Sequence, residues 1–330
     1  MDDQVSDNSK SGSDSRNPHT RSLKPPVGIV AGSVCGIIAA ILYTGANIAL
    51  RKCVGMDPFL VSAVKALPTL VALTPFLIWM HSTGQTIATS YAIIPRFIAV
   101  SLIGQFVGNA AFQISLGIIG LAASVPITLG TMIIGGAVLG KVMLRERVTL
   151  RSVLSIITLI AAVVILSLPD ATTRPAESAS EYPLWIGAIC AAASGFAYAL
   201  FGVVVRQALT GGMSAPATMF VSGLVGSISL WIFCWLRLGW DQIGATPSEN
   251  WPMMVAAGIL NFVAFIALST ALKALPVVAV NLINASQVAM AAIAGVILFS
   301  EPITLPLIAG ILLTFAGLAI LAQRRSDKPK

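Results

Sequence analysis

Charged side chains are scarce in this chain. Lys, Arg, Asp and Glu make up 10% of its 330 residues, whereas hydrophobic residues make up 56% and the mean hydropathy is +0.89. A soluble domain carries about 25% charged residues. A soluble protein of this length has no core large enough for so much apolar side chain, so the composition indicates an integral membrane protein.

The groups that enzymes and ATP-driven pumps need are also missing from the apolar part of the chain. Of the two histidines, His19 lies in the N-terminal tail and His81 in a predicted loop, and the four cysteines form no CxxC pair. None of the 13 carboxylates lies deep in a predicted span, and the chain has no Gly-rich phosphate-binding loop. We therefore expect no metal, no cofactor and no catalysis. A membrane-embedded enzyme is the less favoured alternative.

About 20 helical residues cross the hydrocarbon of a bilayer. Ten apolar stretches of about this length follow one another along the chain. They are 27–49, 58–80, 94–115, 120–143, 150–168, 183–205, 215–236, 252–272, 277–299 and 303–322. The polar residues 1–26 read as a disordered cytoplasmic tail rather than a signal peptide. Residues 169–182 form a linker, and residues 323–330 a basic cytoplasmic tail.

The ten stretches divide into two sets of five, 27–168 and 183–322. The second set repeats the first at an offset of 155 residues, so that Tyr43 of the first set corresponds to Tyr198 of the second. Other matched pairs are Gly32 and Gly187, Arg51 and Arg206, Gly140 and Gly295, Glu146 and Glu301, and Thr149 and Thr304. Because five crossings are an odd number, the second copy must insert upside down, as in secondary transporters. The predicted fold is an all-α membrane protein with ten transmembrane helices, arranged as two inverted five-helix repeats around a central cavity.

The basic residues set the predicted orientation. With the N-terminus inside, 15 of the 20 Lys and Arg residues lie on the inner side and four on the outer side, while Lys65 lies within a span. The positive-inside rule then places both termini in the cytoplasm. The net charge of +7 is thus explained by topology, and we expect the lipid bilayer, not nucleic acid, as a partner.

Sequence patterns near the ends of matched helices resemble a known group of transporters. One helix ends Gly135-Gly-Ala-Val-Leu-Gly-Lys-Val-Met-Leu-Arg-Glu-Arg-Val-Thr149, and its repeat mate ends Ala294-Gly-Val-Ile-Leu-Phe-Ser-Glu-Pro-Ile-Thr304. These endings, with the segments Tyr43–Arg51 and Gly195–Arg206, resemble the two-repeat EamA branch of the drug/metabolite transporter superfamily. The resemblance implies a ten-helix carrier with a central cavity that moves small organic solutes, often outward.

Polar residues inside the predicted spans are the best map of that cavity, because a polar group in hydrocarbon costs several kcal/mol unless it finds a partner. In the stretch 94–115, Ser101, Gln105, Asn109 and Gln113 recur every four residues and share one helix face. Two interpretations stay open. The face lines a cavity for a polar solute, or it makes hydrogen bonds to neighbouring helices.

Lys65 is the one charged residue well inside a predicted span. An intramembrane charge is by default a functional-site hypothesis, and here it favours a contact with an anionic group such as a carboxylate. The alternatives are snorkelling of the lysine toward the outer interface and a structural pair with Asp57.

Further polar residues are predicted to converge on the same cavity, although packing explains any single one equally well. They are Tyr43, Asn47, Thr128, Tyr198, Asn261, Asn281, Asn284 and Gln287. Glu146 and Glu301 lie at predicted helix ends, and we expect them to act in capping and interfacial pairing. Since Glu301 precedes Pro302, it is predicted to cap the start of the helix 303–322.

These observations predict a secondary transporter that moves a small polar organic metabolite by alternating access, with export as the expected direction. The lysine and the amides favour an amino-acid-like or other zwitterionic or anionic solute. A nucleotide-sugar or other organic-anion exchanger of the same superfamily is the alternative. The expected location is the cell membrane, and the expected state is a monomer or a homodimer.

Overall fold

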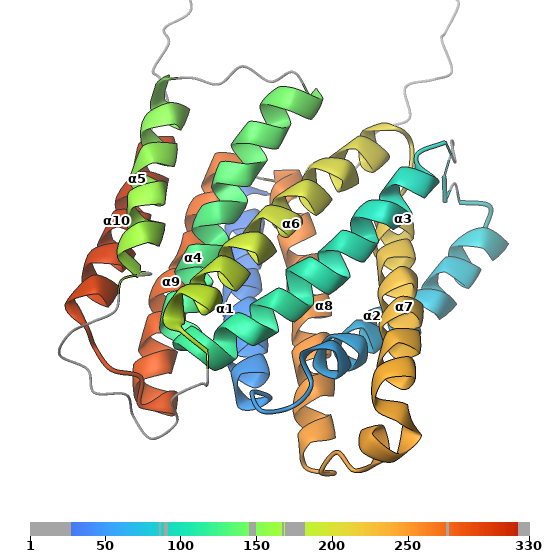
Figure 1. Ribbon diagram of the computed structural model, residues 1–330. Coiled ribbons are helices and arrows are strands. Elements are labelled where there is room, and N and C mark those ends of the chain that lie inside the picture. The colour runs from blue at the N-terminus through green and yellow to red at the C-terminus, as the bar shows by residue number, and fades with distance from the viewer. Residues whose placement is uncertain are drawn as a thin grey trace, which may run out of the picture.

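The computed structural model describes residues 28–85, 87–88, 92–144, 150–166, 168, 182–274 and 277–322. Every regular element within these ranges is a helix, and the helices form one bundle (Figure 1). They are α1 (Ile29–Lys52), α2 (Pro58–Ser82), α3 (Ile94–Ile103), the π-helix η1 (Gly104–Asn109), α4 (Ala110–Leu144), α5 (Leu150–Leu166), α6 (Leu184–Thr210), α7 (Ala215–Gly244), α8 (Asn250–Ala274), α9 (Val277–Phe299) and α10 (Leu305–Ala322). The predicted tails, nearly all of the linker 169–182, and Glu146 lie outside the described residues.

The helices have the length and composition of membrane spans. Within the described part of the chain, six are long and apolar enough to cross a bilayer, and shorter apolar helices lie at Val153–Leu166, Ser286–Phe299 and Leu305–Gly317. Large apolar side chains are exposed on the outside of the bundle, for example Val71 at 69% and Ile297 at 71%. An apolar exterior suits lipid rather than water, so the chain is an integral multi-pass membrane protein.

The predicted loop between 115 and 120 is absent. Helical structure runs from α3 through η1 into α4, interrupted only at Gly120, whose φ of 76° and ψ of 179° are not helical. Glycine adopts a positive φ without the steric penalty that other residues meet. A turn at one residue leaves few backbone groups without a partner, which matters at the end of a membrane helix.

The two halves of the chain interleave rather than lie side by side. α1 packs against α8 and α9, α6 packs against η1 and α4, and α2 packs against α7. α5 and α10 pair with each other at one edge of the bundle (Figure 1). Small residues allow close approach where the halves meet. A Cβ atom added to Gly135 of α4 would lie 2.9 Å from the Cβ of Ala199 in α6.

A packed apolar cluster occupies the end of the bundle where α1 connects to α2. We call it the end core, and it is formed by both halves of the chain. Its fully buried members include Cys53, Leu60, Leu116, Leu121, Leu230, Cys234, Met254 and Ala291. The end core packs this end of the bundle with apolar side chains from both halves.

Candidate functional site

A cavity of about 430 Å³ lies in the middle of the bundle, beyond the end core. Helices from both halves line it. Ten of the residues predicted from the sequence are among its lining residues: Tyr43, Asn47, Lys65, Gln105, Asn109, Thr128, Tyr198, Asn261, Asn284 and Gln287. The cavity also reaches Val205 of α6 and Met219 of α7, toward the end of the bundle opposite the end core.

Two predicted residues are placed differently. Gln113 does not line the cavity, because its Nε2 donates to the backbone carbonyl of Leu50 at 2.9 Å and it is 4% exposed. Gln113 thus bridges two helices, which was the alternative interpretation for this face. The side chain of Asn281 lies outside the described residues.

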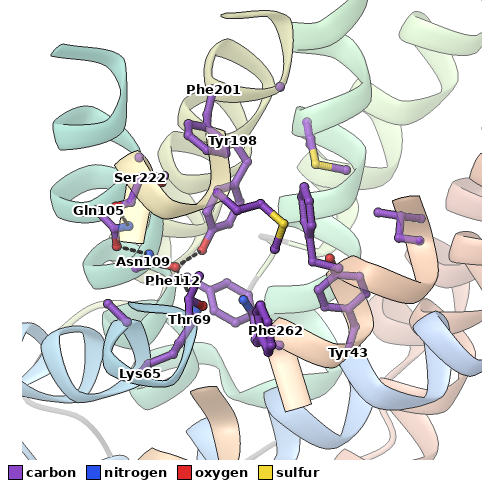
Figure 2. Close-up of a pocket in the computed structure, with 18 of the residues that line it drawn as sticks. Tyr43, Lys65, Thr69, Gln105, Asn109, Phe112, Tyr198, Phe201, Ser222 and Phe262 are labelled. Atoms are coloured by element: carbon purple, nitrogen blue, oxygen red, sulfur yellow. Dashed lines mark hydrogen bonds between the residues drawn. The ribbon is translucent and has the colours of Figure 1, made fainter. Parts of the chain in front are cut away.

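The polar wall of the cavity is a chain of hydrogen bonds centred on Asn109 (Figure 2). Lys65 Nζ donates to Asn109 Oδ1 at 2.8 Å, and the hydroxyl of Tyr198 donates to the same oxygen at 2.7 Å. Asn109 Nδ2 donates to Gln105 Oε1 at 2.6 Å, and Gln105 Nε2 lies 3.4 Å from the carbonyl oxygen of Ser222. Helices from both halves are joined at this point.

Lys65 has no acidic partner in this wall. No carboxylate of the described residues forms an ion pair with it, and no described lining residue of the cavity is an Asp or Glu. Asp57, considered above as its partner, instead accepts hydrogen bonds from the backbone N–H groups of Phe59 and Leu60 and pairs with Arg237. The snorkelling alternative is not the arrangement seen, because the lysine head turns to Asn109. Lys65 therefore carries the single positive charge of the described lining.

The backbone around this wall is shaped to hold its side chains. Gln105 and Asn109 lie in η1, a π-helical segment, and such segments occur frequently at functional sites. The ring of Tyr198 packs on Gly108, where an added Cβ would lie 2.9 Å from the ring atom Cε1. Gln105 packs in the same way on Gly226 of α7. The glycines thus provide the space that the hydrogen-bonded side chains occupy.

Polar groups also lie on α4 and α9. Thr128 Oγ1 donates to the carbonyl of Ala191 at 3.1 Å, and Gln287 Nε2 donates to Asn284 Oδ1 at 3.1 Å. Ser101 lines the cavity at 1% exposure, and its hydroxyl has no hydrogen-bond partner within the part of the chain that the structure describes.

An apolar wall completes the cavity and was missed by sequence reasoning. It includes Phe112, Phe201, Phe262, Phe265 and Leu268. Aromatic and aliphatic residues are expected both where a helix faces lipid and where it faces a cavity, so hydropathy carries no signal that separates the two. The site therefore combines one charged and amide-rich wall with an apolar one, which is the usual composition of a small-molecule pocket.

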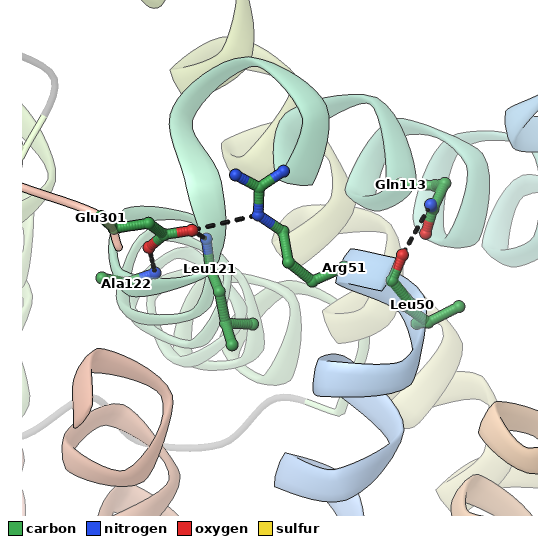
Figure 3. Close-up of polar contacts among 6 residues, drawn as sticks. All are labelled: Leu50, Arg51, Gln113, Leu121, Ala122 and Glu301. Atoms are coloured by element: carbon green, nitrogen blue, oxygen red, sulfur yellow. Dashed lines mark hydrogen bonds and ion pairs between the residues drawn. The ribbon is translucent and has the colours of Figure 1, made fainter. Parts of the chain in front are cut away.

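The structure corrects the predicted role of Glu301. Thr304 Oγ1 accepts from the backbone N–H of Leu307 at the start of α10. Glu301 instead accepts from the backbone N–H groups of Leu121 and Ala122, at 2.7 and 2.8 Å, and from Arg51 Nε at 3.0 Å (Figure 3). It caps the helical segment after Gly120, in the other half of the chain. The start of α10, which is next to Glu301 in the sequence, is capped by Thr304 instead.

Comparisons with known proteins agree with this picture. Residues 185–323 match the family model described as "EamA-like transporter family". A solved structure entitled only "Crystal structure of protein" is 16% identical, covers 88% of this chain and 96% of its own, and superposes with a TM-score of 0.57. At that identity the likeness concerns the fold alone. No curated protein matches the chain.

Proposed function

We propose that the whole chain is a secondary transporter for a small organic solute with an anionic group. The support is that residues 185–323 match the EamA-like transporter family and that both halves resemble the drug/metabolite transporter superfamily in sequence. The family is one of transporters rather than enzymes. The solute binds in the central cavity, and the helices of the two halves move relative to each other to expose it to either side.

Ten spans in two inverted repeats are part of this proposal. The apolar segment Ile94–Met143 contains 50 residues, and at about 1.5 Å per residue it is far longer than a hydrocarbon core of about 30 Å. The break at Gly120 divides it into two pieces that each suit one crossing. With these counted separately, the packing of α1 on α8 and α9 has its counterpart in α6 on the two pieces. α2 corresponds to α7 under the repeat, and α5 corresponds to α10. The contacts α2–α7 and α5–α10 therefore stay the same when the two halves are exchanged.

The observation that carries the solute class is the position of Lys65. Its ammonium group lies on the cavity wall with Asn109 and without an acidic partner among the described residues. A charge in a low-dielectric site is costly without an opposite charge. A carboxylate or similar anion on the solute provides that charge, while the hydroxyl of Tyr198 and the amides bind its other polar groups.

The size and the second wall of the cavity favour an amino-acid-like metabolite. About 430 Å³ lies in the range of small-molecule pockets, roughly 300–1,000 Å³. The apolar wall around Phe112 and Phe262 provides a place for an apolar body. The proposed location is the cell membrane with both termini in the cytoplasm, so the α1–α2 end faces outward and the cavity reaches toward the cytoplasm. Export is the proposed direction.

Uptake into proteoliposomes across a panel of amino acids, organic acids, sugar nucleotides and organic cations tests this function. We expect uptake of a carboxylate-bearing solute and its loss in Lys65→Ala. The matched control is Lys52→Ala, which removes an exposed lysine from the end of α1 and should leave uptake unchanged. Transport of organic cations alone, or full uptake by Lys65→Ala, would refute the proposed site.

A further inference from the structure

The Glu301 carboxylate lies in a pocket that both halves of the chain build at the α1–α2 end. Gly120 of the first half and Gly295 of α9 provide the space. A Cβ added to Gly120 would lie 2.5 Å from Glu301 Oε1, and one added to Gly295 would overlap the carboxylate even more. Ser300, the residue before Glu301, has a φ of 52° and is the only non-glycine with positive φ among the described residues. The backbone on both sides is thus shaped around this one side chain.

The three groups that Glu301 binds all belong to the first half. The break at Gly120 leaves the N–H groups of Leu121 and Ala122 without helical acceptors, and the carboxylate of the second half accepts from both. Arg51, in the last turn of α1, adds a charged donor, and its guanidinium also lies 5.5 Å from the centre of the Phe299 ring. Glu301 is therefore a polar contact between halves.

This contact lies at the same end of the bundle as the end core. A second ion pair, between Asp57 before α2 and Arg237 of α7, also joins the two halves there. Separating an interface of buried apolar contacts alone costs much free energy, because apolar surface becomes exposed to water. In contrast, a carboxylate, a guanidinium and two N–H groups exchange their mutual hydrogen bonds for water, so the net free energy that holds the contact closed is moderate rather than large. Such a contact suits an interface that opens repeatedly.

We propose that Glu301, with Arg51 and the N–H groups of Leu121 and Ala122, is a latch that holds the α1–α2 end shut, and that its release opens the cavity to this side. The inference goes beyond the proposed solute, and it needs only that the cavity opens at two ends. Glutamine has one acceptor oxygen and an NH2 group that cannot accept, so Glu301→Gln loses at least one of the three hydrogen bonds and removes the charge from the rest. We expect the population open at the α1–α2 end to rise about tenfold in Glu301→Gln.

Thiol labelling of the full-length protein in membranes tests the latch without any solute. The four native cysteines are replaced by alanine, and Ala66→Cys places one thiol on the cavity wall. A charged thiol reagent that does not cross membranes is added to one side at a time. Ser248→Cys, in the exposed loop before α8, identifies the side on which the α1–α2 end lies. The matched control is Glu249→Gln, the same change at an exposed glutamate of that loop.

The expected result is that Glu301→Gln raises the labelling rate of Ala66→Cys about tenfold from the α1–α2 side and lowers it from the other side, while Glu249→Gln changes neither. Arg51→Gln removes one of the three donors and should shift labelling in the same direction by less, which keeps the test decisive if Glu301→Gln does not fold. Unchanged labelling in the folded variants, or an equal change in Glu249→Gln, overturns the latch. Failure of the Lys65 transport test would leave this result standing, because labelling requires no solute.

Discussion

Replacing Asn109 by aspartate tests whether Lys65 is the charge that a solute meets. Asn109 Oδ1 accepts from Lys65 Nζ at 2.8 Å and from the hydroxyl of Tyr198 at 2.7 Å. Aspartate has nearly the same shape, keeps the oxygen that accepts both hydrogen bonds and adds a negative charge next to the lysine. The Nδ2 donor to Gln105 is lost. The Gln105 amide can reverse and donate to the new carboxylate, at the expense of its long 3.4 Å contact with the carbonyl oxygen of Ser222.

The magnitude follows from the change in hydrogen-bond type. The bond from the Lys65 ammonium to Asn109 already has one charged partner, a class of hydrogen bond that contributes about 1.5–3 kcal/mol, and aspartate turns it into a stronger bond between opposite charges. The carboxylate introduced by Asn109→Asp would therefore hold Lys65 more firmly by about 1–2 kcal/mol, and it would also cancel the charge that attracts an anion. Together we expect a loss of about 3 kcal/mol in solute binding, or roughly a hundredfold in affinity. The desolvation cost of the new carboxylate opposes the gain from its pairing with Lys65, so we expect the stability of the folded state to stay about the same.

The assay is concentration-dependent uptake of the identified solute into proteoliposomes, with the thermal unfolding midpoint measured in detergent. Asn47→Asp is the matched control, because Asn47 lines the same cavity from α1. A new carboxylate anywhere in the cavity repels an anion, so the difference between the two variants measures the specific loss of Lys65. Asn109→Asp with wild-type affinity, or a loss no larger than that of Asn47→Asp, would show that the lysine is not the anion contact.

Two glycine substitutions test the shape of the site. Gly108→Ala places a Cβ 2.9 Å from the Tyr198 ring, so we expect the ring to move away from Asn109 and uptake to fall severalfold with little change in unfolding midpoint. Gly258→Ala places a Cβ 2.5 Å from the backbone carbonyl oxygen of Lys65, and since a backbone cannot yield as a side chain can, we expect a loss of about 1–3 kcal/mol in stability, seen as a lower midpoint. Gly202→Ala is the control for both, because it lines the cavity with nothing within 4 Å of the added atom. Equal behaviour of the three variants would contradict the packing described.

The helices could be predicted because the bilayer dictates both their length and their composition. The predicted stretch 58–80 lies within α2 (Pro58–Ser82), and the stretch 277–299 coincides with α9. The exception is the turn at Gly120. In the sequence, a glycine that adopts a positive φ cannot be distinguished from the glycines that pack helices together. The prediction from hydropathy therefore placed a short loop there instead of a turn at one residue.

Membership of the cavity lining was also predictable, since polar side chains inside a span need polar surroundings. The hydrogen-bond partners were not predictable, because they depend on how helices far apart in sequence cross. Gln113 shows the limit. Its four-residue spacing from Asn109 implied a common face, but at 3.6 residues per turn each step of four residues also drifts by about 40° around the helix axis, and Gln113 is the last of the series. The side chain then turns to Leu50 instead of the cavity.

The two halves differ inside the cavity, and this difference fits the proposed combination of movement and binding in one scaffold. Under the offset of 155 residues, Tyr43 corresponds to Tyr198, and both line the cavity. Lys65, however, corresponds to Phe220, and Asn109 corresponds to Ala264. If the repeats are inverted, matching backbones allow the two ends to open with similar energies, since each end uses the same packing in turn. A solute needs the opposite property, a lining that fixes one orientation. In the proposed function the charge of Lys65 lies on one half only, so the anionic end of the solute would stay with α2 whichever end of the bundle is open.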